Sequence, residues 1–155
     1  MNPERFGVHT VKLNAKFFDE LTPSELYEIL KARAAVFVVE QNCVYQDVDG
    51  VDYRSLHVFY ESDGCVTAYL RLFPKTDEEG TVQMGRVLTV QRGTGLGGVL
   101  LKDGIRLARE KMNARKIFLE AQCYAAGFYA REGFRICSGE FLEDGIPHVA
   151  MELTL

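Results

Sequence analysis

The sequence predicts an α/β (α+β) protein with a mixed, mostly antiparallel central sheet of about seven strands flanked by helices. Three observations predict this class. Strand-like runs between residues 56 and 90 return on one another through short polar turns. The last of these runs enters a glycine-rich turn that opens a long amphipathic helix. Two further strands close the chain. With 155 residues, of which 47% are hydrophobic, the chain is expected to form a single domain over residues 1–155.

The N-terminal third is predicted to hold a strand, a capped helix and a loop. Apolar and polar residues alternate over 10–17, which is typical of a half-buried strand. Residues 22–25 form a capping box with proline at the first helical position, and an apolar stripe continues the helix to about Phe37. The acidic, irregular residues 40–54 predict a long loop.

The remaining elements follow from turn residues and from changes in the spacing of apolar residues. Short Asp-Gly and Glu-Gly turns separate the strands of the middle part. The short helix after the fifth expected strand is stopped by Gly133. The expected elements are strands 56–61, 65–73 and 81–90, a helix from Gly97 to near Asn113, strand 116–121, helix 125–131, and closing strands 134–138 and 148–155.

The glycine-rich turn of residues 92–98 is the most informative segment. Backbone N–H groups converge in such a turn, and the start of the following helix adds a partial positive charge. Glycine is needed because a Cβ would hinder a positive φ and would block close approach of a ligand. We therefore expect a phosphate-bearing molecule to bind here.

Two known kinds of phosphate-binding glycine loop, the P-loop and the dinucleotide fingerprint, can be compared with this turn. A P-loop requires Lys and Ser or Thr after its last glycine, but Val and Leu follow Gly98. Gly93, Gly95 and Gly98 do fit a dinucleotide fingerprint, with Glu120 as its acidic residue. A dinucleotide fold, however, repeats parallel strand–helix units, and here an antiparallel meander precedes the loop. The order of elements therefore weighs against it.

The third pattern is Arg-x-x-Gly-x-Gly, over residues 92–97, which resembles the acyl-CoA pyrophosphate loop of the GNAT superfamily of N-acetyltransferases. A second motif, AAGFYAREGF over 125–134, resembles the Ala-x-x-Phe-Tyr-x-x-x-Gly-Phe segment of that superfamily. Residues 35–43 and 47–49 are similar to the ElaA-like branch, and 140–151 resemble a pattern shared with YjcF-like relatives. The resemblance implies the GNAT acyl-CoA N-acyltransferase fold over nearly the whole chain.

The resemblance also implies a function. An N-acetyltransferase of this kind moves an acetyl group from acetyl-CoA to a primary amine by direct attack in a ternary complex, without a metal. Tyr129 would protonate the departing CoA thiolate, a role that suits a phenol with a pKa near 10. Its alternative role is that of an aromatic core residue beside Phe128. The residues implied to contact the cofactor are Leu88, Thr89 and Val90 along the strand, and Arg92, Gly93, Thr94, Gly95, Leu96, Gly97 and Gly98 around the pyrophosphate.

Several residues could accept the proton of the amine. His148 begins the last predicted strand and titrates in a suitable range, yet it could equally bond the backbone there. Glu40 is the next candidate, although a solvated carboxylate is the favoured interpretation. His57 is expected to be a packed or hydrogen-bonded residue, whereas Glu120 could face the cleft. Cys123 is a candidate for a different role, the thiol of a ping-pong reaction, but its neighbours supply no base or positive charge, so it is interpreted as packing.

Composition limits the classes of binding partner and the cellular compartment that we expect. The net charge is −4 without a block of like charge, which argues against a nucleic-acid surface. No signal-peptide pattern and no membrane-length apolar run occur, and the four cysteines are scattered, so a cytoplasmic protein with reduced thiols is expected. The predicted partner is a small-molecule or protein amine, with a homodimer also admitted. The acidic loop with Asp47, Asp49 and Asp52 suggests a cationic acceptor, but a solvated loop is favoured.

Two other function classes remain open. The first is an acyl-CoA-binding module that senses CoA without turnover, since a tyrosine can persist for packing alone. The second is a nicotinamide-dependent oxidoreductase, because the glycine spacing also fits a dinucleotide. Release of CoA thiol in the presence of amines would separate the leading interpretation from both.

Overall fold

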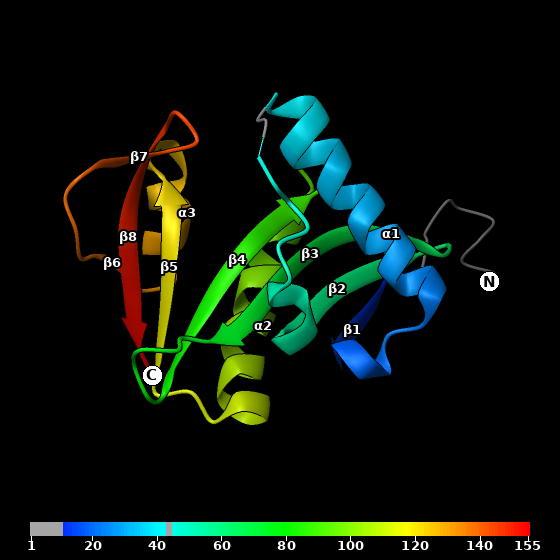
Figure 1. Ribbon diagram of the computed structural model, residues 1–155, viewed down its shortest axis with the longest axis horizontal. Helices are drawn as coiled ribbons and strands as arrows, with labels where there is room; N and C mark the ends of the chain where they lie inside the picture. Colours follow the sequence, from blue (N-terminus) through cyan, green and yellow to red (C-terminus); the bar gives the residue numbers. More distant parts are fainter. Residues whose placement is uncertain (1–10, 43–44) are drawn as a thin grey trace.

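The computed structural model describes residues 11–42 and 45–155. Its centre is an eight-stranded sheet in the order β1-β2-β3-β4-β5-β8-β6, with β7 paired to β8 (Figure 1). All described strand pairs are antiparallel except β4 with β5. The strands are β1 (Lys12–Phe17), β2 (Leu56–Ser62), β3 (Cys65–Pro74), β4 (Thr81–Thr89), β5 (Lys116–Gln122), β6 (Arg135–Ile136), β7 (Phe141–Glu143) and β8 (Ile146–Thr154). The helices are η2 (Phe18–Glu20), α1 (Pro23–Arg33), η3 (Ala34–Glu40), η4 (Val51–Arg54), α2 (Leu96–Met112), η5 (Cys123–Ala125) and α3 (Ala126–Ala130).

Helix α1 begins where its capping box predicts. The N–H of Glu25 donates to the hydroxyl of Thr22 at 3.1 Å, and the N–H of Thr22 donates to the Glu25 carboxylate at 2.9 Å. The chain stays helical beyond Phe37, because α1 runs directly into the π-helical segment η3, which ends at Glu40. Such wide turns are rare and often occur beside functional sites.

Two apolar cores cover the two faces of the sheet. On one face, side chains of α1 and η3 such as Ile29 and Phe37 pack against Phe59 and Tyr69. On the other, α2 lies against β3 and β4 (Figure 1). Gly104 of α2 permits this close approach, since a Cβ there would lie 2.8 Å from the Leu70 side chain. No helix in the described part of the chain is long and apolar enough to cross a membrane.

The sheet splits between β4 and β5. These strands pair only where Thr81–Gln83 meets Lys116–Phe118, and beyond that point they diverge (Figure 1). A bulge in β4 accompanies the split. Arg86 has a φ of 52°, and the register of β3 with β4 shifts between Tyr69 and Arg71. Because a bulge bends its strand and increases the local twist, it turns β4 away from β5.

The C-terminal end contains one strand more than expected. A two-residue turn at Asp144 and Gly145, with φ values of 52° and 77°, joins β7 to β8. The last strand therefore begins at Ile146, two residues before the expected start at His148. This correction matters for function, because the hairpin carries Glu143 alongside His148.

Candidate active site

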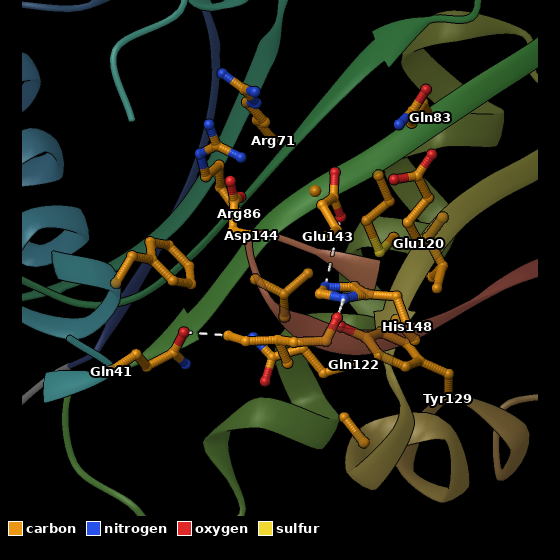
Figure 2. Close-up of a pocket in the computed structure, with 18 of the residues that line it drawn as sticks. Gln41, Arg71, Gln83, Arg86, Glu120, Gln122, Tyr129, Glu143, Asp144 and His148 are labelled. Carbon is orange, nitrogen blue, oxygen red and sulfur yellow. Dashed lines mark hydrogen bonds and ion pairs between the residues drawn. The ribbon is translucent and has the colours of Figure 1, made fainter. Parts of the chain in front are cut away.

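A cavity of about 360 Å³ occupies the space between the diverging strands. Its wall draws on η3, β3, β4, β5, the η5–α3 segment and the β7–β8 hairpin, which brings together segments far apart in sequence (Figure 2). Both predicted catalytic residues, Tyr129 and His148, line this one cavity. The predicted cofactor residues 88–90 and 92–98 are not part of its lining. They lie further along, where β4 ends and α2 begins.

Tyr129 projects from α3 and is 9% exposed. Its ring packs edge-on against Phe128 and Phe134, so the aromatic packing considered from the sequence is present as well. Within the described residues its hydroxyl makes no hydrogen bond. Burial, with a smaller effect of Tyr124, raises the pKa of Tyr129 above its usual value, and the hydroxyl therefore keeps its proton at neutral pH.

His148 lies on β8 opposite Gln122 of β5 and is 7% exposed. Its Nδ1 lies 2.7 Å from the carbonyl oxygen of Ile146, and its Nε2 lies 3.4 Å from a carboxylate oxygen of Glu143 (Figure 2). The ring of Phe141 stacks on it with centroids 5.9 Å apart. The backbone bond considered from the sequence therefore exists, and it leaves the second ring nitrogen directed toward the cavity wall.

An acidic pair lies beside His148. Glu120 of β5 and Glu143 of β7 both line the cavity. Burial raises the pKa of Glu120 above its ordinary value, and the nearby Glu143 carboxylate raises it further. Glu120 thus faces the cleft, as one of the interpretations allowed. Glu143 was not predicted as a site residue, because a three-residue strand is too short to show alternation of apolar and polar residues. The signal that could have revealed this strand is the Asp-Gly turn that follows it, which is typical of a hairpin.

The glycine loop has the geometry of an anion-binding turn. Gly93 and Gly95 both have a φ of 77°, and Gly95 caps the start of α2. A Cβ on either glycine would meet no atom within 4 Å, so the space above the loop is open. The first N–H groups of an α-helix have no partner within the helix, so this end can take an anion. Arg92 lies here and pairs with Glu40 at 2.5 Å.

At the end of β4, the backbone N–H groups point alternately toward β3 and into the split between β4 and β5. The N–H of Val90 donates to the Thr67 carbonyl of the neighbouring strand at 2.9 Å and is therefore occupied. Amide directions alternate along a strand, so the N–H of Leu88 also points toward β3, and that of Thr89 points into the split. Of the three residues expected to donate to pantetheine, Thr89 has the suitably directed N–H.

The other candidate residues lie elsewhere. Glu40 lies outside the cavity lining, in its ion pair with Arg92. His57 is fully buried and bonds the Tyr69 hydroxyl and the Asp52 carbonyl, as expected of a packed histidine. Cys123 packs against the core, where burial raises the pKa of its thiol. Among the described residues, no group of His, Cys, Asp and Glu could hold a metal ion.

The acidic loop is not a solvated loop. Asp47 and Asp52 are 9% and 6% exposed, and they bind arginines from three separate elements. We call this group of six residues the arginine–aspartate cluster: Arg33, Arg71, Arg86, Asp47, Asp49 and Asp52.

Arg33, which is fully buried, contacts Asp47 at 3.1 Å and Asp52 at 2.7 Å. Arg71 binds Asp49 at 2.7 Å and Asp52 at 3.0 Å, and Arg86 binds Asp47 at 2.8 Å. The favoured interpretation of these aspartates was therefore wrong, and their charges are used inside the protein. The cluster fixes the segment after η3 against β3 and β4, where it forms one wall of the cavity.

Comparisons of sequence agree with this architecture. Residues 19–155 match the family described as Acetyltransferase (GNAT) domain. A UPF0039 protein of Schizosaccharomyces pombe is 40% identical over 144 residues, which are 90% of this chain and 95% of that one. Protein ElaA of Escherichia coli is 36% identical over 136 residues, with 85% of this chain and 89% of that protein covered. The similarity to the ElaA-like branch is thus confirmed.

Solved structures show the same fold. An acyl-CoA N-acyltransferase from Pseudomonas aeruginosa superposes with a TM-score of 0.86 at 38% identity, covering 92% of this chain and 99% of that chain. A GNAT acetyltransferase from Elizabethkingia anophelis with acetyl-CoA bound has a TM-score of 0.61 at 18% identity, covering 94% and 98%. The latter likeness concerns the fold alone.

Proposed function

The chain belongs to the GNAT acetyltransferase family, and from this premise we propose that it transfers the acetyl group of acetyl-CoA to a primary amine by direct attack in a ternary complex. Membership of the family supports the coarser activity, an acyltransferase that uses an acyl-CoA. The observation that carries the finer proposal is the shared cavity: the hydroxyl of Tyr129 and the ring of His148 line the same space between β4 and β5.

In the proposed complex, the loop after β4 holds the pyrophosphate of CoA. Arg92 contributes its guanidinium, and the start of α2 contributes the N–H groups that follow Leu96, whose own N–H donates to the Thr94 hydroxyl at 3.3 Å. The pantetheine arm then follows the unpaired edge of β4, where the N–H of Thr89 can donate to it. The acetyltransferase from Elizabethkingia anophelis, which has the same fold and was solved with acetyl-CoA bound, supports the choice of co-substrate.

The chemistry requires the acceptor nitrogen to lose two protons and the departing sulfur to gain one. His148 takes one proton from the acceptor ammonium, which leaves a lone pair on the amine nitrogen. That nitrogen attacks the thioester carbon, so that an N–C bond forms and the C–S bond breaks. The CoA sulfur leaves with the electron pair of the C–S bond and receives the proton of Tyr129. The attached nitrogen loses its second proton as the neutral amide forms. This proton restores the tyrosinate, and His148 releases the proton it took to solvent.

The decisive experiment measures free CoA thiol while acetyl-CoA is mixed with a panel of primary amines. We expect thiol release that depends on the amine and that is lowered by about 10²-fold or more in His148→Asn, with CoA binding retained. Saturable CoA binding without amine-dependent release would instead favour the sensing module. A bound nicotinamide cofactor, visible by its absorbance, would favour the oxidoreductase.

Binding of CoA can be tested at the glycine loop. A valine at Gly95 places branched carbon atoms in the open space above the loop, so we expect Gly95→Val to weaken CoA binding by at least about 10-fold, measured by calorimetry. The positive φ at this position also strains any other residue, by about 1–3 kcal/mol.

Gly64 supplies the matched control for that strain. Its φ is 76°, a Cβ there also meets nothing within 4 Å, and it lies in the turn between β2 and β3. Gly64→Val should therefore lose similar stability and keep its affinity for CoA. Equal CoA affinity in the two folded variants would remove the pyrophosphate site from this loop.

A further inference from the structure

Three side chains that can accept hydrogen bonds, those of Glu120, Glu143 and His148, line the cavity beside the split. A carbonyl oxygen can only accept, so the 2.7 Å contact with Ile146 places the proton of a neutral His148 ring on Nδ1. Nε2 then carries a lone pair. The His148 side chain is 9% exposed, and within the described part of the chain its Nε2 faces only the carboxylate of Glu143, at 3.4 Å. An acceptor facing an acceptor is an unsatisfied arrangement.

The two carboxylates add to this shortage of donors. Among residues 11–42 and 45–155, neither Glu120 nor Glu143 forms an ion pair with a lysine or arginine. The contrast with the opposite wall is clear, because there Arg71 and Arg86 are matched by aspartates. The titratable and charged groups that line the cavity around His148 are Glu120 from β5, Glu143 and Asp144 from the hairpin, Tyr124 and Tyr129 from the η5–α3 segment, Tyr45 and Asp49 from the segment between η3 and η4, and Arg71 and Arg86 from β3 and β4. Lys75 lies outside this lining, and its charge opposes the rise in the pKa of Glu120.

We propose that Glu120, Glu143 and Nε2 of His148 form a receptor for the three N–H groups of a primary ammonium ion. A protonated primary amine carries three donors and one positive charge, which matches three acceptors and two carboxylates. The inference rests on the proposed function in one respect: His148 must be neutral in order to act as the base. It adds the side chains that select the acceptor, one of which, Glu143, lies on a strand absent from the predicted fold.

The receptor also explains how the amine is held during deprotonation. One N–H bond of the ammonium breaks and a new N–H bond forms at Nε2, so the positive charge moves to the ring. Glu143, already 3.4 Å from Nε2, then stabilises the ring cation. The two N–H groups that remain can still donate to the carboxylates. The nitrogen lone pair becomes available while its position changes little, which favours attack on the thioester.

The specificity that follows is testable without turnover. The probes are the chlorides of n-butylammonium, N-methylbutylammonium and butyltrimethylammonium. Their binding is measured from the shifts of the NMR signals of the His148 ring. The sequence contains three histidines, and His148→Asn identifies the signal. We expect saturable shifts with n-butylammonium and binding weaker by about 3- to 10-fold for each donor replaced by methyl. Butyltrimethylammonium has the same charge and no N–H donor, so it should not saturate the site.

Matched variants test the two carboxylates. Glu143→Gln and Glu120→Gln keep shape and remove charge, and each should weaken n-butylammonium by about 10-fold or more. Glu140→Gln is the control, since Glu140 is exposed, lies outside the cavity lining and belongs to the same C-terminal segment. Thermal midpoints equal to that of the original protein would show that the variants remain folded.

The outcomes separate this proposal from the proposed function. Equal binding of the three ammonium probes, equal shifts with magnesium chloride, the absence of any saturable shift, or unchanged affinity in both Gln variants would each overturn the receptor. Amine-dependent thiol release would survive any of these results. Conversely, selective ammonium binding without thiol release would leave the receptor in place and contradict acetyl transfer.

Discussion

Tyr129→Phe should lower the turnover rate by about 10²- to 10⁴-fold while acetyl-CoA binding changes little. The reason is local. Phenylalanine keeps the edge-on packing against Phe128 and Phe134 and removes only a hydroxyl that has no hydrogen-bond partner among the described residues. The CoA thiolate would then leave without a proton donor. Turnover is measured from thiol release and binding by calorimetry.

The control for this variant is Tyr27→Phe, because Tyr27 is 69% exposed on α1 and is not part of the cavity lining. It should retain full turnover. A Tyr129→Phe protein with unchanged turnover would make Tyr129 a packing residue, and the proton for the thiolate would have to come from solvent. Loss of CoA binding in parallel would instead indicate a structural role at the split.

Arg33→Met should reduce the free energy of unfolding by about 3–5 kcal/mol, the usual consequence of removing one partner from a buried ion pair. Methionine fills part of the space but leaves Asp47 and Asp52 without the guanidinium that binds both. At roughly 2–4 °C per kcal/mol for a domain of this size, the thermal midpoint should fall by about 6–20 °C. Arg106→Met, at an exposed pair on α2, should cost about 1 kcal/mol or less.

The same cluster sets the response to acid. Arg71 and Arg86 lower the pKa of Asp49 to about 2 against the opposing effect of burial, and Arg33 and Arg71 lower the pKa of Asp52. Both carboxylates bind protons more readily in the unfolded chain, so their stabilisation is complete above about pH 4 and disappears as the pH falls through their folded-state pKa values. The stability difference between the original protein and Arg33→Met should therefore shrink toward pH 2. A difference that stays constant over that range would contradict this account.

The parts of the fold encoded by local pattern were predictable. The capping box of residues 22–25 specifies the start of α1, and the glycines of residues 93–98 specify the turn into α2. Two separate sequence motifs, around Tyr129 and His148, contain residues that line one cavity. For the helix starts the signal is a short run of residues whose backbone or hydrogen-bonding preferences admit few structures, whereas Tyr129 and His148 were singled out through the resemblance to the GNAT superfamily.

The parts that depend on long-range pairing were not predictable. Asp47 and Asp52 look like solvated charges because their partners lie 14 to 39 positions away, and spacing alone cannot show which arginine folds back onto them. Arg86 adopts a left-handed conformation that its residue type does not favour, so the bulge leaves no mark in the sequence. Strand β7 has three residues, too few for an alternation to be recognised.

The brief contact between β4 and β5 has a consequence for how the chain folds. Strands β2, β3 and β4 follow one another through short turns and can associate early, because closing a short loop costs little entropy. Joining them to β5 and β8 requires β4 to pair in parallel with β5, to which it is connected through α2. Only three residue pairs stabilise this contact. We therefore expect that this junction forms late. It should also open before the rest of the sheet, and amides along it should exchange with solvent sooner than those of β2 and β3.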